Sequence, residues 1–442
     1  MVNFFRAGKK HVAFNVVMLG ILFFTANYIL TLLFHLQSGY IIWSDAEGYY
    51  EYLPFYFIFH DITHICYAVP VAGGMTFDKY PCGVALLEMP FFLVAHLYNQ
   101  IFGFIDDGVT SVYGMSIWIA AVFYVYAGLV MLFNILRKWF SRWASFITVL
   151  VLFYGTNLFY YTLFNPGYAH AYGFFVLVLF VYGLDKFLKK PTVGNTIICG
   201  LGIGLAVLIR PTNVFYVFLF LLYDVYTFKS LKERVVWIFK KTWYFLLIAL
   251  ITFIVFIPQM LYWHAVLGQY VAYSYDYSQG GSESFIYWNS PKIGYTLFGV
   301  ESGWLVYSPV FFLFFAGLVW TLIKRIHHSF AILTLFILIL YANASWWCYT
   351  FSCSFGQRAL IEYYPVFIIP VAFIIQKALG AKRKVALIIL AFFLTIFSFL
   401  NLRMSEFYYV EQCWVRPDWT WVNYNRVLNK AFYIIPQERD IK

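Results

Sequence analysis

Charged residues are scarce in this chain of 442 residues: only 11% are Asp, Glu, Lys or Arg, whereas 63% are hydrophobic. This balance excludes a soluble globular domain. Apolar stretches of about 18 to 24 residues recur, each long enough to cross a bilayer as a helix, whereas a β-barrel would show strands alternating over about 10 residues. The composition therefore predicts an all-α polytopic membrane protein.

Cysteine is also sparse. The six cysteines show neither CxxC spacing nor the dense pattern of a disulfide-rich domain. They set no fold. Cys348 and Cys353 could form a disulfide if their loop faces an oxidising compartment, but unpaired, small apolar side chains are the simpler interpretation. The sequence also contains no internal repeat, low-complexity segment or nucleotide-binding glycine loop.

About eleven apolar stretches are candidate membrane spans. They cover residues 12 to 35, 113 to 136, 143 to 163, 168 to 186, 192 to 209, 212 to 228, 242 to 263, 303 to 323, 329 to 346, 361 to 377 and 384 to 402. If all of them cross, every basic cluster between them falls on one side, which the positive-inside rule makes cytoplasmic. The net charge of +10 then reflects topology and not nucleic-acid binding. We expect a bacterial inner-membrane protein with a cytoplasmic N-terminus and a periplasmic C-terminus.

One further apolar segment, residues 81 to 104, is long enough to span, but its crossing would move the next basic cluster to the outside. Because it contains Glu88 and Pro90, we expect a juxtamembrane helix, or a broken one, along the outer face. The expected organisation is a transmembrane module (1 to 402) with two large outer loops (37 to 112 and 264 to 302) and a short exoplasmic tail (403 to 442).

Acidic residues crowd into the first outer loop. Asp45 lies between Trp43 and Tyr49 at a membrane boundary, where a carboxylate is costly unless it has a function, and helix capping or solvation is the alternative. Glu47 is a candidate second acid or metal ligand. We expect Glu51 to lie on the solvated face.

Isolated basic residues also stand at outer membrane boundaries. Lys79, Arg210 and Arg358 are functional candidates in these positions, unless they only snorkel to the surface. Lys79 could instead pair with Asp78, and Arg210 could anchor its turn. A carboxylate that accepts a hydroxyl proton, combined with cations that neutralise a departing phosphate, suits transfer from an anionic, lipid-borne donor.

Four short motifs carry a resemblance to a known family: Trp-Ser-Asp-x-x-x-Tyr-Tyr (43 to 50), KYPCGVALLEMPFF (79 to 92), ESGWLVYSP (301 to 309) and SFGQR (354 to 358). With the long first helix, they resemble the GT-C superfamily of membrane glycosyltransferases. The likeness is greatest to the branch of protein O-mannosyltransferases and lipid A aminoarabinose transferases. It covers most of the chain in architecture, and it is motif-specific in these patches.

The resemblance implies an exoplasmic active site, a polyprenyl-phosphate sugar as donor and a hydroxyl acceptor on a protein, lipid or glycan. The first-loop Asp of the family is the catalytic base, and Asp45 matches it. The usual adjacent acid is replaced by Ala46, so Glu47 is the candidate companion. Transfer would be inverting and metal-independent. A transporter or flippase of lipid-linked saccharides is the alternative, although such proteins place ionisable residues at mid-membrane.

Three histidines complete the set of candidates. His170, at an outer helix end, could bind phosphate or sugar together with Lys79, Arg210 and Arg358. His60 and His64 have the i, i+4 spacing of a divalent-metal pair. Because no third ligand is identifiable, a solvated loop is the preferred interpretation, and we predict neither metal nor cofactor. Rings of the second outer loop, and those near Trp346, are candidates for stacking on sugar.

Overall fold

The computed structural model describes residues 16–29, 41–278, 283–381, 384–411 and 419–432. Within these ranges the regular secondary structure is helical apart from one antiparallel hairpin of β1 (Val69–Pro70) and β2 (Thr76–Phe77), in which Val69 pairs with Phe77. The described part of the first predicted span is a helix, Val16–Ile29.

The remaining α-helices are α2 (Asp45–Tyr50), α3 (Tyr52–Phe57), α4 (Gly83–Phe102), α5 (Ser111–Leu136), α6 (Arg142–Tyr154), α7 (Leu158–Leu163), α8 (Ala169–Lys189), α9 (Val193–Ile209), α10 (Phe218–Leu222), α11 (Phe228–Lys240), α12 (Thr242–Leu267), α13 (Ile293–Phe298), α14 (Trp304–Tyr307), α15 (Phe312–Lys324), α16 (Ser329–Ser345), α17 (Tyr364–Leu379), α18 (Lys384–Glu411) and α19 (Trp421–Ala431). Five 3₁₀ turns join them, namely η1 (Ala72–Gly74), η2 (Pro211–Val217), η3 (Ser274–Asp276), η4 (Pro309–Phe311) and η5 (Arg358–Tyr363).

Six of the described helices are long and apolar enough to cross a membrane: Gly83–Phe102, Ser111–Leu136, Ala169–Lys189, Thr242–Leu267, Arg358–Leu379 and Lys384–Val410. Six shorter apolar helices accompany them: Val16–Ile29, Arg142–Tyr154, Val193–Ile209, Pro211–Leu222, Pro309–Lys324 and Ser329–Ser345. Each predicted span overlaps one of these twelve helices, and α4 is the one left over. The chain is therefore an integral membrane protein, whereas the number of eleven crossings stays a prediction.

Several predicted boundaries are wrong. The stretch 143 to 163 divides into α6 and α7 at Gly155, a residue of low helix propensity. The stretch 303 to 323 starts with α14 and a 3₁₀ turn because Pro309 lacks the backbone N–H that a continuous helix needs. In the stretch 212 to 228 the helix ends at Leu222. Helix α18 continues to Glu411, well past the predicted limit of 402.

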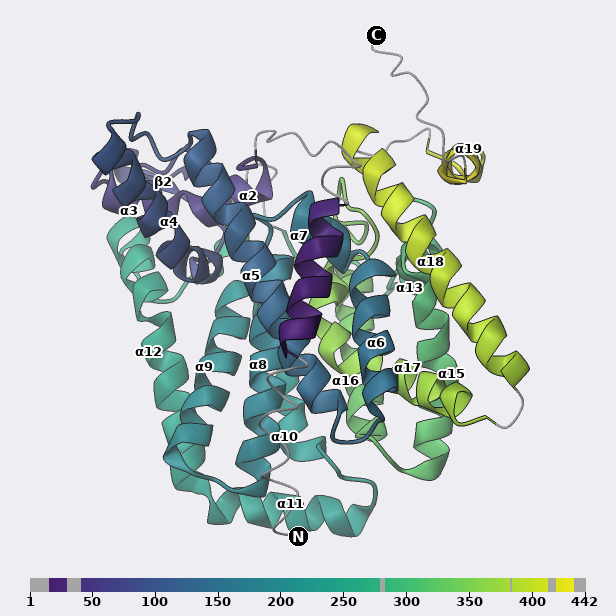
Figure 1. Cartoon of the computed structure of the whole chain (residues 1–442). Coiled ribbons are helices and arrows are strands. Elements are labelled where there is room, and N and C mark those ends of the chain that lie inside the picture. The colour runs from purple at the N-terminus through teal and green to yellow at the C-terminus, as the bar shows by residue number, and fades with distance from the viewer. Residues whose placement is uncertain (1–15, 30–40, 279–282, 382–383, 412–418, 433–442) are drawn as a thin grey trace.

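The basic turns meet at one end of the bundle. The Asp185 carboxylate near the end of α8 accepts hydrogen bonds from Lys138 after α5, from Lys189 and from the hydroxyl of Tyr223 after α10. The lysine-containing helix α11 lies across this same end (Figure 1). This gathering of the basic turns agrees with the charge distribution predicted from the sequence.

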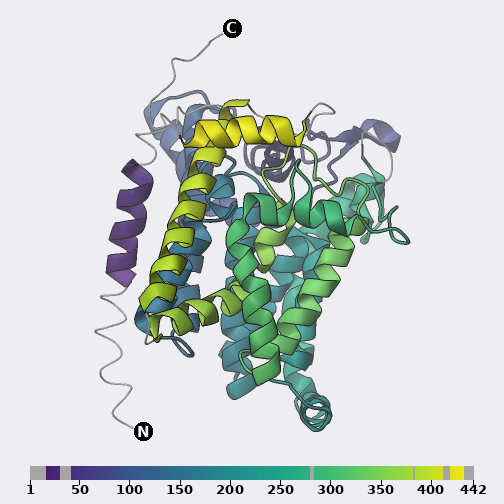
Figure 2. The same ribbon diagram turned by 90° about the vertical axis from the view of Figure 1, so that its right-hand side faces the viewer.

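The first outer loop folds at the opposite end of the bundle. Figure 1 places α2, α3, β2 and α4 together there, and Figure 2 shows α19 lying across this end beside the end of α18. Helix α4 is continuous through Pro90, so it is not broken as one alternative required. The Glu88 side chain is buried inside the protein.

Candidate functional site

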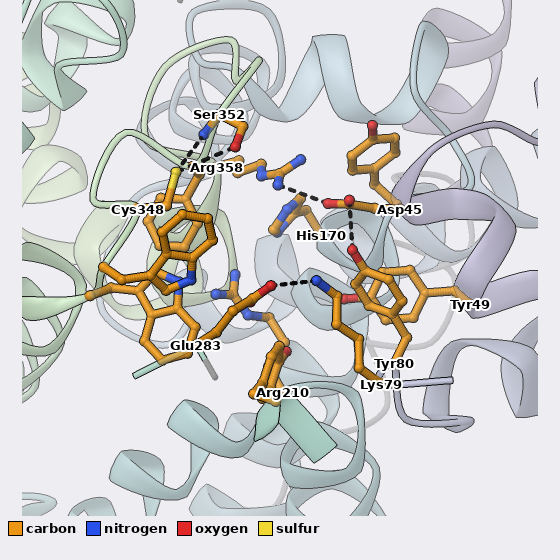
Figure 3. Close-up of a pocket in the computed structure, with 15 residues that line it drawn as sticks. Asp45, Tyr49, Lys79, Tyr80, His170, Arg210, Glu283, Cys348, Ser352 and Arg358 are labelled. Atoms are coloured by element: carbon orange, nitrogen blue, oxygen red, sulfur yellow. Dashed lines mark hydrogen bonds and ion pairs between the residues drawn. The ribbon is translucent and has the colours of Figure 1, made fainter. Parts of the chain in front are cut away.

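A cavity of about 130 Å³ lies at the end of the bundle that carries the first outer loop. Segments far apart in the sequence supply its walls (Figure 3). The lining residues are Asp45, Tyr49, Lys79, Tyr80, Tyr168, His170, Arg210, Tyr275, Glu283, Trp346, Trp347, Cys348, Phe351, Ser352 and Arg358. Five predicted site residues, Asp45, Lys79, His170, Arg210 and Arg358, are therefore brought together in one cavity.

The local backbone aims Asp45 into this cavity. Ser44 has a φ of 55°, in the left-handed region that residues other than glycine seldom adopt, and α2 begins immediately after this turn. Gly48 then lies so close to the Tyr80 ring that a Cβ at this position would clash with it. The turn and the glycine together let α2 pack directly on the segment that carries Lys79 and Tyr80.

Both carboxylate oxygens of Asp45 have partners. Arg358 Nη2 lies 2.8 Å from Oδ2, and the Tyr80 hydroxyl donates to Oδ1 at 2.7 Å (Figure 3). Burial raises the pKa of Asp45, but the Arg358 guanidinium and the Tyr80 hydroxyl outweigh it, so the pKa lies below its usual value. Asp45 is therefore ionised at neutral pH, as a proton acceptor must be.

Lys79 pairs across the cavity with Glu283 and not with the neighbouring Asp78. Its Nζ lies 2.5 Å from Glu283 Oε1 and 3.3 Å from the hydroxyl of Ser278. Asp78 instead turns into the protein, where its Oδ1 accepts from the backbone N–H of Tyr80 at 2.8 Å. Burial keeps the pKa of Asp78 well above its usual value. The loop thus presents Lys79 to the cavity while it keeps Asp78 out.

The buried carboxylate of Glu362 contacts two further candidate residues, His170 and Arg210. Glu362 Oε1 lies 3.2 Å from His170 Nδ1 and 3.5 Å from Arg210 Nη1, and its side chain has no exposed surface. Arg210, which caps the C-terminus of α9, also lies over the ring of Phe351 at 5.5 Å. Glu362 therefore anchors the histidine and the arginine on the inner side of the cavity.

The cavity combines balanced charge with aromatic walls. Each of its three cations has an acidic partner: Lys79 has Glu283, Arg210 has Glu362 and Arg358 has Asp45. The rings that line the walls are those of Tyr49, Tyr80, Tyr168, Tyr275, Trp346, Trp347 and Phe351. A site of this kind can neutralise an anion with its cations and hold an uncharged ring against its aromatic faces.

Glu47 is not among the residues that line the cavity. Residues at i and i+2 of a helix point in different directions, so Asp45 and Glu47 in α2 cannot both face it. Glu47 instead neighbours Glu51, four residues later. The assignment of Glu51 to a solvated face is wrong: it is buried, with 7% of its surface exposed, and it accepts a hydrogen bond from the backbone N–H of Tyr67 at 2.7 Å.

Glu51 should make stability depend on pH. Burial raises its pKa from 4.5 to about 7, so between these values the folded state holds a proton that the unfolded state has released. The free energy of unfolding should therefore fall as pH rises through this window. Replacing Glu51 with Gln should remove that part of the slope, whereas Glu233→Gln on exposed α11 should leave it intact. The measurement is the thermal unfolding temperature of the three proteins against pH, and equal slopes would contradict the assignment.

The structure also tests the candidate disulfide between Cys348 and Cys353 and the candidate metal pair of His60 and His64. Cys348 carries a free thiol, so it does not pair with Cys353, which is disulfide-bonded. His64 Nδ1 lies 2.8 Å from Asp61 on the exposed surface, and His60 Nδ1 contacts the carbonyl of Tyr56. The part of the chain that the structure describes contains no group of three or more metal-ligating side chains.

Three polar partners of the predicted site residues were not themselves predicted. Tyr80 directly follows Lys79 in the KYP motif, but a tyrosine is unremarkable in a chain that is 24% aromatic. Glu283 lies in the second outer loop, where acids are expected. A signal did exist for Glu362, because an acid in an apolar stretch is costly and usually functional.

Comparisons with known proteins add little to this geometry. No protein-family model matches the sequence, and no curated protein matches it. Among solved structures, the chain is similar to the archaeal oligosaccharyltransferase AglB from Archaeoglobus fulgidus, in complex with an inhibitory peptide and a dolichol-phosphate. The identity is 14% and the TM-score 0.48; the match covers 95% of this chain and only 60% of that one. At this TM-score the similarity assigns neither a family nor an activity.

Proposed function

We propose that the protein is an inverting glycosyltransferase that moves a sugar from a polyprenyl-phosphate donor to a hydroxyl acceptor. The observation that carries this proposal is the cavity itself, in which an ionised carboxylate, Asp45, lies beside the three cations Lys79, Arg210 and Arg358. A base for the acceptor and counter-charges for a leaving phosphate are the two requirements of such a transfer.

The proposed reaction uses these residues in the following way. Asp45 takes the proton of the acceptor hydroxyl as its oxygen attacks the anomeric carbon. The bond from this carbon to the phosphate oxygen breaks, and its electron pair stays on the departing polyprenyl phosphate. The three cations stabilise that charge, and the aromatic walls hold the sugar ring. Attack from the face opposite the leaving group inverts the anomeric configuration.

The location of the cavity supports an exoplasmic site. The basic turns gather at the opposite end of the bundle, and such turns favour the cytoplasm. The disulfide-bonded Cys353 lies in the same loop as the cavity-lining Cys348 and Ser352. Disulfides persist in oxidising compartments, so we assign this end to the periplasmic side of a bacterial inner membrane.

A transfer assay tests the proposal. The purified, full-length protein is incubated with labelled polyprenyl-phosphate sugars and with protein, lipid and glycan acceptors. We expect transfer with inverted anomeric configuration from one lipid-linked donor, and none from nucleotide sugars. Asp61→Asn, which changes an exposed acid of the first outer loop, should transfer as the parent does.

Two outcomes would contradict the proposal. One is no transfer from any lipid-linked donor to any acceptor class. The other is movement of intact lipid-linked sugar across sealed vesicles without covalent change, because that result would establish the flippase alternative.

A further inference from the structure

The contacts that Asp45 makes with Arg358 and Tyr80 weaken it as a base. Arg358 Nη2 contacts Oδ2 and the Tyr80 hydroxyl donates to Oδ1, so each oxygen already has a partner that stabilises the ionised carboxylate. The charged and titratable groups around Asp45 are Arg358, Lys79, His170 and the tyrosines Tyr80, Tyr49, Tyr67, Tyr161, Tyr168 and Tyr275. With the arginine in place, the first three of these groups and the Tyr80 hydroxyl lower the pKa of the carboxylate and make it a weak proton acceptor.

Arg358 is also one of the three cations available to a donor phosphate. Its guanidinium lies over the Tyr168 ring at 5.2 Å, its side chain is 12% exposed, and it lines the cavity. Phosphate oxygens favour two parallel hydrogen bonds from one guanidinium. A phosphate placed there would therefore compete with Asp45 for Arg358, and its negative charge would oppose that of the carboxylate.

We propose that Arg358 couples donor binding to activation of the base: it holds Asp45 in the empty site and exchanges this carboxylate for the donor phosphate, so that Asp45 becomes an effective base only after the donor has bound. This inference rests on the proposed function and adds an order of binding to it. The donor binds first and the acceptor second, and the acceptor hydroxyl is deprotonated only in the complete complex.

Tyr80 is the positioning residue in this exchange. Its backbone is fixed by Asp78 Oδ1 and by the Tyr52 hydroxyl, which donates to its carbonyl at 2.6 Å. Its ring packs against Tyr49, with centroids 4.7 Å apart. Tyr80 therefore keeps hold of Oδ1 while Arg358 leaves Oδ2, and Oδ2 becomes the atom that accepts the proton of the attacking hydroxyl.

Calorimetry with farnesyl phosphate, a short polyprenyl monophosphate without sugar, tests the exchange on the full-length protein. Asp45→Asn removes the competing carboxylate, so it should bind the probe about five- to tenfold more tightly than the parent. Titrations near pH 5 in buffers of different ionisation enthalpy should show proton uptake by the parent that Asp45→Asn lacks. Protonation changes of the phosphate itself occur in both proteins, so the difference between them reports Asp45.

The outcomes separate this inference from the proposed function. Equal affinity and equal proton exchange in the two proteins would overturn the coupling and leave the transferase proposal standing. Absence of binding to both proteins would overturn the phosphate site and both proposals with it. Tyr80→Phe should retain the affinity for farnesyl phosphate and shift the acidic limb of the kcat/KM profile upward, because Asp45 loses a hydrogen bond to its charged form. A merely structural Tyr80 would leave that limb in place.

Discussion

Replacing Asp45 with Asn is expected to lower kcat for sugar transfer by about 10²- to 10⁴-fold, the usual contribution of a general base. Asparagine has nearly the same shape, and its single amide oxygen can still accept from one of the two groups that contact Asp45, the Tyr80 hydroxyl or the Arg358 guanidinium, but it cannot take up a proton. The KM for the donor should not rise, because the phosphate no longer competes with a carboxylate for Arg358. The measurement is steady-state transfer with each substrate varied in turn.

Two comparisons make the Asp45 prediction specific. Asp61→Asn should retain the parent rate because Asp61 lies on the exposed surface, and Lys79→Ala should raise the donor KM more than it lowers kcat. If Asp45→Asn transferred sugar as fast as the parent, the base would have to be another group of the cavity. Glu283 would then be the next candidate, since it is a lining carboxylate.

Replacing Glu362 with Ala is expected to reduce the free energy of unfolding by about 3 to 5 kcal/mol, the range found when one partner of a buried ion pair is removed. The Glu362 side chain is fully buried and neutralises Arg210 while it also contacts His170. Its removal leaves the guanidinium charge without its acidic partner inside the helix bundle. Chemical or thermal unfolding in detergent measures the loss.

A double variant shows whether the charge or the packing is responsible. Glu362→Leu combined with Arg210→Met removes both charges and fills the space, so it should recover most of the lost stability. The same protein should lose donor affinity, because one of the three cations is gone. Glu233→Ala on exposed α11 serves as the control with little effect. A loss equally large in the double variant would mean that packing, and not charge pairing, holds this region.

The sequence predicted which charged residues form the site better than it predicted how those residues pair in space. Lys79, Arg210 and Arg358 stood out because ionisable groups at apolar boundaries are rare, and they meet in one cavity with Asp45. The pairing pattern was not predictable, since Glu283 reaches Lys79 from a loop more than 200 positions later and no local periodicity encodes such a contact. Glu47 illustrates the limit within a single helix, because a difference of two positions along α2 decides which acid faces the cavity.

The fold was predictable to a similar degree. Hydrophobic length located every apolar helix, because a bilayer demands long apolar segments. It did not locate the breaks at Gly155 and Pro309, where tertiary contacts satisfy the interrupted backbone: the N–H of Asn157, for example, is held by the hydroxyl of Ser308. The hairpin of β1 and β2 was missed because two-residue strands leave no alternating pattern.

The contact between Asp45 and Arg358 also has a consequence for biosynthesis. Its two partners are separated by most of the chain, so the ribosome delivers the acid long before the arginine. A nascent or truncated chain that ends before η5 contains Asp45 and Lys79 without Arg358, the cation that pairs with Asp45. The complete cavity therefore comes into existence only when the late helices have inserted, and a partly made protein has the acidic wall of the cavity without its full set of cations.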